Sequence, residues 1–191
     1  MSRSLFATRL YESVIDDPGL LDELSHSIRS FADEDSAGRA WSKEHRYAGY
    51  TSYASLNDLP KRDPTFAELA KLLVRHASAF AAECGFDLKR KPKLDSLWVN
   101  LLKSGGQHGA HIHPHSIISG ALYVEAPKGS GAIRFEDPRL PLMMAAPPRP
   151  NMFVTAEPRP GLLLMWESWL RHEVLPGAGK GERLSISFNF A

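Results

Sequence analysis

The stretch RLSISFNF at residues 183–190 decides the fold of this chain. Successive residues of an extended chain point to opposite faces, so one face of this stretch is wholly polar and the other wholly apolar. The run therefore predicts a β-strand whose apolar face lies in a core. Its polar face lies either in solvent or inside a small barrel, where buried polar groups would line a site. The polar residues are Arg183, Ser185, Ser187 and Asn189.

Short apolar or alternating segments, separated by Gly- and Pro-rich turns, fill the rest of the second half of the chain. This spacing is typical of a β-sandwich or barrel. The many prolines over residues 137–160 exclude a long helix there, and we expect a loop with one edge strand at Met152–Thr155. The other predicted strands are Leu94–Leu102, Ile117–Glu125, Gly131–Glu136, Gly161–Trp166 and Arg183–Phe190.

The first half of the chain has helical signals. Asp17-Pro18 and Asp63-Pro64 each combine an N-cap residue with a first-turn proline, and apolar residues recur at helical spacing after both. Gly85 is a natural stop for the second helix. Residues 35–62 between them are a packed loop or short strands.

We therefore predict a mainly β fold with packed helices, a double-stranded β-helix (jelly roll, cupin-like) with N-terminal helices. The 191 residues favour a single domain over residues 1–191. Residues 1–92 would supply helical support and substrate-side loops, and residues 93–191 the jelly-roll catalytic core.

Composition narrows the function classes. Formal net charge is +1, which offers no electrostatic case for binding nucleic acid or a membrane surface. The N-terminal residues lack the apolar core of a signal peptide, and no run is long enough for a membrane span. The single cysteine, Cys84, fits a reducing compartment. These features predict a cytoplasmic protein.

The histidines suggest a metal site. His111 and His113 are two apart, so a strand would place both imidazoles on one face and Ile112 on the other. His172, from a turn after a distant apolar strand, is the best third ligand. Three such ligands leave open positions for substrate and oxygen, as in non-haem Fe(II) enzymes. His108 and His115 compete for these roles but rank lower, because the first falls in a predicted loop and the second follows Pro114. The alternative is that the histidines lie at the surface or in the core with satisfied hydrogen bonds.

The polar face of residues 183–190 suggests an anion anchor. Arg183 can bind a carboxylate with two parallel hydrogen bonds, and Ser185 can add a hydroxyl donor from the same face. The alternative is that this face is exposed to solvent. The presence of the candidate metal-binding histidines favours a binding site over that alternative. Trp98, Trp166 and Trp169 are interpreted as core or barrel-rim residues and not as a substrate platform.

Four motifs together resemble a known family. The sequence is similar to the 2-oxoglutarate- and Fe(II)-dependent oxygenases, especially an uncharacterised bacterial group with an H-x-H-P…S-G-x-x-Y motif, and more distantly to prolyl hydroxylases. The resemblance covers roughly residues 94–191. The motifs are HIHPHSIISGALYV at 111–124, GAIRFEDPR at 131–139, PGLLLMWESWLRH at 160–172 and RLSISFN at 183–189.

The resemblance implies roles for particular residues. His111 matches the first metal ligand and His172 the last, while His113 falls where most of the superfamily has Asp or Glu. Arg183 matches the residue that binds the C5 carboxylate of 2-oxoglutarate, and Ser185 its partner. Tyr123 and Asn100, on strands entering the site, are predicted to contact the co-substrate or to support the residues that do, and a core tyrosine with a satisfied hydroxyl is the alternative for Tyr123. Histidines 111, 113 and 172 would thus be the catalytic metal ligands.

The implied function is an enzyme that uses Fe(II) and 2-oxoglutarate to hydroxylate a substrate, with release of succinate and CO2. Its substrate would be a small molecule or a protein side chain, and exposed sheet edges would allow a homodimer. The all-histidine triad also fits a cupin-type dioxygenase that does not use 2-oxoglutarate. A non-catalytic jelly-roll module holding a structural zinc through four ligands is the other alternative.

Overall fold

The computed structural model describes residue 3, residues 6–139 and residues 152–191. The helices are α1 (Pro18–Glu34), α2 (Ser36–Glu44), the short 3-10 helix η1 (Leu59–Lys61) and α3 (Pro64–Glu83). The strands are β1 (Leu10–Val14), β2 (Gly49–Thr51), β3 (Leu94–Leu102), β4 (His108–His111), β5 (Ile118–Glu125), β6 (Ile133–Glu136), β7 (Phe153–Ala156), β8 (Leu162–Glu167), β9 (His172–Val174) and β10 (Arg183–Phe190).

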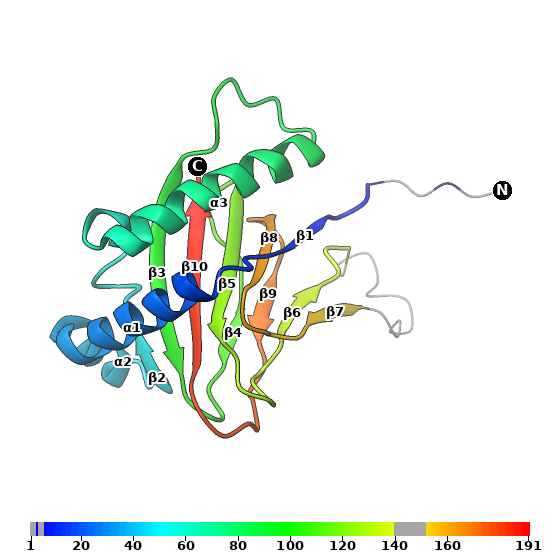
Figure 1. Ribbon diagram of the computed structural model, residues 1–191. Helices are drawn as coiled ribbons and strands as arrows, with labels where there is room; N and C mark the ends of the chain where they lie inside the picture. Colours follow the sequence, from blue (N-terminus) through cyan, green and yellow to red (C-terminus); the bar gives the residue numbers. More distant parts are fainter. Residues whose placement is uncertain (1–2, 4–5, 140–151) are drawn as a thin grey trace.

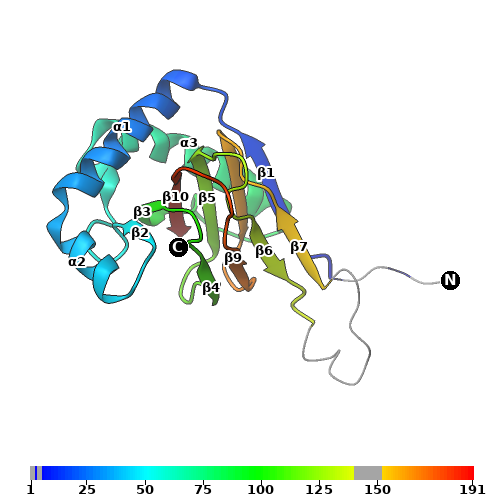
Figure 2. The same cartoon turned by 90° about the horizontal axis from the view of Figure 1, so that it is seen from below.

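The strands form two antiparallel sheets. A six-stranded sheet has the order β1-β8-β5-β10-β3-β2, and a four-stranded sheet has the order β4-β9-β6-β7. Helices α1 and α3 lie across one face of the larger sheet, and the smaller sheet lies on its other side (Figures 1 and 2). Sheets facing each other beneath a helical layer confirm the predicted double-stranded β-helix with N-terminal helices.

The helices begin where the sequence predicted. The side chain of Asp17 accepts a hydrogen bond from the backbone N–H of Leu20, and that of Asp63 accepts one from Thr65, so each caps its helix. Gly85 follows α3 with φ +74°, a left-handed conformation that glycine adopts at little cost. Local sequence signals therefore start both helices, and Gly85 ends the second of them.

Two separate apolar clusters flank the six-stranded sheet. The larger one joins the buried stripes of α1 and α3 to one face of the sheet, and includes Leu184, Ile186, Phe188 and Phe190 with no exposed surface. The smaller one lies between the two sheets and contains Tyr123, Phe135, Leu164 and Trp166. Together they leave one polar space between the sheets, beside β10.

Several sequence predictions need correction. β4 ends at His111, so His113 lies just beyond the strand, and its backbone N–H donates to the carbonyl of Ser168. His172 begins β9 and does not sit in a turn. The sequence missed β1 and α2, because β1 is a half-exposed edge strand and α2 starts directly after α1.

The expected edge strand at Met152–Thr155 is present as Phe153–Ala156. The rest of the predicted proline-rich loop includes residues 140–151, which lie outside the described residues. Among the residues that are described, no helix is long and apolar enough to cross a membrane.

Candidate metal centre

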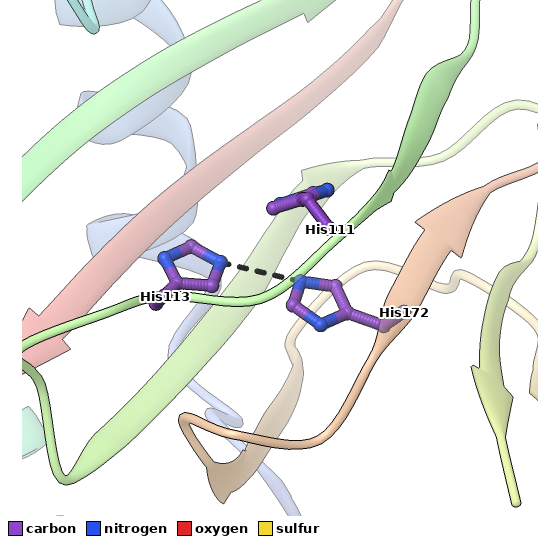
Figure 3. A group of neighbouring side chains, drawn as sticks. All are labelled: His111, His113 and His172. Atoms are coloured by element: carbon purple, nitrogen blue, oxygen red, sulfur yellow. Dashed lines mark hydrogen bonds between the residues drawn. The ribbon is translucent and has the colours of Figure 1, made fainter. Parts of the chain in front are cut away.

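Two strand ends bring the three predicted histidines together. In the smaller sheet His111 pairs directly with His172, and His113 follows two residues after His111. The candidate ligand atoms of all three lie within 4.8 Å of one another (Figure 3). His172 is buried and His111 is the most exposed, so the group opens toward one side.

Backbone carbonyls set the protonation of two of the rings. The Nδ1–H of His111 donates to the carbonyl of Gly109 at 2.7 Å, and the Nδ1–H of His172 donates to that of Leu170 at 2.8 Å. A carbonyl only accepts, so each ring must carry its proton on Nδ1. The lone pair of each Nε2 is then free for a metal ion, which is the usual arrangement around metal-bound histidine.

The distance between two ring nitrogens fits a shared ion. The Nε2 atoms of His113 and His172 are 3.2 Å apart (Figure 3). Nitrogens bonded at about 2.1 Å to one ion, at a right angle to each other, lie about 3.0 Å apart. With the His172 Nε2 unprotonated, this nitrogen can accept a hydrogen bond from a protonated His113 Nε2, and with both unprotonated the two nitrogens are close enough to bind one metal ion.

Burial keeps the rings in the metal-binding form. It lowers the pKa of His113 to about 4, and it lowers the pKa of His172 to about 3. In both cases loss of hydration disfavours the charged imidazolium. The two imidazoles are therefore neutral at pH 7, and neutral imidazole is the form that binds metal.

A buried arginine marks the other end of the site. Arg183 is 4% exposed, and one of its Nη atoms donates to the carbonyl of Gly131 at 2.8 Å. Its guanidinium carbon lies 5.6 Å from the centre of the Tyr123 ring. Within the described residues no carboxylate pairs with Arg183, and its Nε has no hydrogen-bond partner. A buried cation without a counter-ion is costly, so this environment favours an anionic ligand.

The predicted co-substrate residues surround that arginine on neighbouring strands. Ser185 of β10 is in register with Asn100 of β3 on one side and with Tyr123 of β5 on the other. The Asn100 amide accepts from the Thr51 hydroxyl at 2.8 Å and donates to the Ser187 hydroxyl at 3.0 Å. Burial raises the pKa of Tyr123 to about 12, so its hydroxyl stays protonated and can donate.

A single cavity of about 530 Å³ unites the two ends. It lies between the sheets, and its volume is within the usual range for a small-molecule site, about 300–1,000 Å³. Every residue predicted for the site lines this cavity: His111, His113, His172, Arg183, Ser185, Tyr123 and Asn100.

Sequence reasoning missed Tyr47 and ranked His108 low, yet these two residues form a second pair in the cavity. The Tyr47 hydroxyl lies 2.7 Å from Nε2 of His108, and both side chains line the cavity. His108 was expected in a loop, but it begins β4. A bulge between His108 and His111 adds one residue to the strand, so residues three apart can both reach the site. A regular strand would place them on opposite faces, and the sequence carried no sign of the bulge.

His115 is not part of the histidine group. It is exposed and has φ +70°. It lines a second depression, which has only some of its lining residues in common with the main cavity. Its lower rank in the sequence prediction agrees with this position. Trp98, by contrast, lines the cavity, which places it at the site as well as in the sheet.

Comparison with known families identifies the class. Residues 96–189 match the family described as "Putative 2OG-Fe(II) oxygenase". This segment holds every predicted ligand and co-substrate residue, and through it the chain is similar to that family of 2-oxoglutarate-dependent Fe(II) oxygenases. No curated protein matches the chain in sequence.

Solved structures support the fold. A prolyl-4-hydroxylase from Pseudomonas putida superimposes with a TM-score of 0.67 at 17% identity, over 96% of this chain and 92% of that one. The α-ketoglutarate-dependent epimerase SnoN of nogalamycin biosynthesis gives 0.67 at 17% identity, over 96% and 78%. HygX from Streptomyces hygroscopicus, with nickel and 2-oxoglutarate bound, gives 0.62 at 13% identity, over 96% and 82%. At these identities the likeness shows the fold alone.

Proposed function

We propose that the protein is an Fe(II)- and 2-oxoglutarate-dependent oxygenase that hydroxylates a substrate and releases succinate and CO2. One observation carries the proposal. A cluster of three histidines and a buried arginine without a carboxylate partner face the same cavity. The first suits a metal ion and the second suits the far end of a dicarboxylate.

The donor set fits the proposed metal. Three imidazole nitrogens are suitable ligands for divalent iron, and a three-point grip leaves positions for other ligands. SnoN has been described with Fe3+ and α-ketoglutarate, and HygX with iron alone and with nickel and 2-oxoglutarate. When bound, iron and 2-oxoglutarate would supply the oxidation: O2 converts 2-oxoglutarate to succinate and CO2, and its second oxygen atom replaces a substrate C–H bond by C–OH.

The chain's own residues would hold and orient these groups. Histidines 111, 113 and 172 are the proposed metal ligands, with His111 and His172 each fixed by the backbone carbonyl of the residue two positions earlier. Arg183 would bind the far carboxylate of 2-oxoglutarate, with Ser185 and Tyr123 as hydroxyl donors beside it. Asn100 is already held by Thr51 and Ser187, so it would present a fixed amide to the co-substrate.

The domain organisation, location and partners of the protein are also proposals. We infer that residues 93–191 form the catalytic core of a single domain and that residues 1–92 support it. We propose a cytoplasmic protein that acts on a small molecule or a protein side chain, without nucleic acid. The exposed edges of β1 and β7 would permit a homodimer.

Anaerobic reconstitution with Fe(II), followed by addition of 2-oxoglutarate, tests the proposal. A weak metal-to-ligand charge-transfer band is expected, because 2-oxoglutarate would chelate the bound ion. Oxygen should then convert 2-oxoglutarate to succinate. Absence of iron binding would overturn the proposal and favour a non-catalytic module.

A second candidate function rests on the histidine at position 113. An imidazole there in place of a carboxylate leaves the bound ion with one more positive charge, as in cupin-type dioxygenases that do not use 2-oxoglutarate. Iron binding without the charge-transfer band, together with oxygen uptake and no succinate, would favour that enzyme.

A further inference from the structure

The cavity has an aromatic wall next to the histidines. Trp41 comes from α2, Tyr53 from the segment after β2, and Trp98 from β3. The rings of Trp41 and Tyr53 are 6.3 Å apart at 61°, and those of Tyr53 and Trp98 are 5.3 Å apart at 69°. These three residues, called the aromatic wall below, form a continuous edge-to-face chain.

The inner end of the wall reaches the proposed metal ligands. The ring of Trp98 lies 6.1 Å from that of His113, with 28° between the two planes. Trp98 is itself in register with Ser187 of β10, so its position is fixed by the larger sheet. A flat ring resting against Trp98 would thus lie beside the histidine group, where a C–H bond can react.

The outer end of the wall is open to solvent but firmly supported. Tyr53 is 54% exposed, so its ring is available to a ligand entering the cavity. The supporting loop is tied down by the carboxylate of Asp35, which accepts from the Tyr50 hydroxyl at 2.8 Å and the Ser55 hydroxyl at 2.5 Å. A wall held in this way needs little ordering when a ligand binds, which favours recognition of a rigid planar group.

The charges of the cavity oppose a cationic substrate. Over the described residues that line it, no side chain is acidic and Arg183 is the only permanent charge. A divalent ion held by neutral imidazoles, together with Arg183 and doubly negative 2-oxoglutarate, would leave one net positive charge. A carboxylate in place of His113 would have cancelled it. Low-dielectric surroundings would make that charge felt by the substrate.

We propose that the substrate is a small planar aromatic acid, whose ring stacks on Trp98 and Tyr53 and whose negative charge is favoured by the cavity. The proposal rests on the proposed function, because the charge balance assumes bound metal and 2-oxoglutarate. The aromatic wall stands without that assumption. Asp95 lies in a second depression that shares Tyr53 and Trp98, and it would attract a cation there instead.

Three matched probes test the substrate class. Indole-3-acetate is aromatic and anionic, tryptamine is aromatic and cationic, and cyclohexylacetate is anionic without an aromatic ring. Binding is measured by calorimetry on protein saturated with Ni(II) and 2-oxoglutarate, which cannot turn over. Indole-3-acetate should bind about tenfold more tightly than either of the others. Equal binding of all three, tighter binding of tryptamine, or no binding of indole-3-acetate would overturn the proposal.

Variants locate the binding and separate the two proposals. Tyr53→Ala and Trp98→Leu should each weaken indole-3-acetate binding about fivefold to tenfold, and in Tyr53→Ala the Ni(II) and 2-oxoglutarate affinities should stay unchanged. Trp169→Ala is the matched control, since Trp169 is 48% exposed and lies off the cavity lining. If Trp98→Leu does not fold, Tyr53→Ala still tests the proposal, because Tyr53 is largely exposed and its loss should leave the fold intact.

The two proposals fail in different ways. Unchanged probe binding in Tyr53→Ala and Trp98→Leu overturns the aromatic wall as the substrate site, whatever the metal result. Wild-type protein that binds neither Ni(II) nor 2-oxoglutarate overturns the proposed function and the charge argument built on it.

Discussion

The two faces of β10 differ in their roles: one face packs in the core, and the other lines the candidate site. Leu184, Ile186 and Phe188 point to the helices and have no exposed surface. Arg183, Ser185 and Ser187 point into the cavity, and the first two are also buried, each with 4% of its surface exposed. Burial alone therefore does not distinguish the core face from the cavity face. The two faces differ in the groups that lie opposite them. The helical layer supplies apolar side chains, whereas the cavity leaves polar groups facing a space for a ligand.

The most destabilising change should be on the helix face. Phe188→Ala removes a ring with no exposed surface, and we expect it to lower the free energy of unfolding by about 3–5 kcal/mol. Ser187→Ala, one residue away on the cavity face, loses only its bond to Asn100 and should cost about 1 kcal/mol. Urea unfolding of both variants measures the difference, and equal losses would show that the two faces are not energetically distinct.

Loss of one histidine on the cavity side should greatly weaken metal binding and leave the stability of the fold largely unchanged. His172→Ala removes a proposed metal ligand on β9, and Fe(II) or Ni(II) affinity should fall about hundredfold or more while the fold survives. Calorimetric metal binding and circular dichroism measure the two effects separately. His115→Ala is the control, because His115 is exposed and lies outside the histidine group. Unchanged metal binding in His172→Ala would remove it from the site.

Substitution of the buried arginine should affect only the co-substrate. Arg183→Met keeps the bulk of the side chain but removes its charge, so 2-oxoglutarate affinity should fall by about 2 kcal/mol or more with metal binding retained. Arg159→Met is the matched control, since Arg159 is about half exposed and pairs with Glu12 at the surface. Equal 2-oxoglutarate affinity in the two variants would place the co-substrate elsewhere.

The smallest effect concerns pH. Burial lowers the pKa of His108 to about 3, against about 6.5 in an unfolded chain. Below pH 6.5 the unfolded state therefore binds a proton that the folded state does not, and stability falls as pH falls. The loss from this group is at most about 1.4 kcal/mol per pH unit.

His108→Gln should flatten that dependence between pH 7 and pH 5. Urea unfolding of the metal-free proteins at both pH values gives the comparison. His113 and His172 titrate with the same sign, so wild type and variant should both lose stability, but the variant less. Parallel pH profiles would show that His108 is not responsible.

Local patterns predicted most of the architecture. The range of β10 was predicted in full, because strict alternation over eight residues fits only one period, and β3 matches its predicted range as well. Both long helices begin after the capping aspartates that were identified. The edge strand β1 was missed, since its half-exposed side chains carry no clear alternation.

The candidate site was predicted less evenly. His111, His113, His172 and Arg183 were named from their spacing and their motifs, and the fold brings all four to one cavity. Tyr47 was not predicted as a site residue, and His108 was ranked below the other histidines as a candidate ligand. Tyr47 lies in a segment without regular pattern, and His108 reaches the cavity only because of a bulge in β4. Trp98 was interpreted as core or rim, and its closeness to His113 appears only in three dimensions.

The sequence by itself determined the periods of the strands, the starts of the helices and the residue types able to hold a metal ion and a carboxylate. These follow from local backbone geometry and from side-chain chemistry, which do not depend on contacts with distant parts of the chain. The tertiary structure decided which face of β10 became the cavity, because that depends on the helices covering its other face. It also decided the protonation of the histidines and the aromatic wall, since burial and ring contacts arise only when distant segments meet.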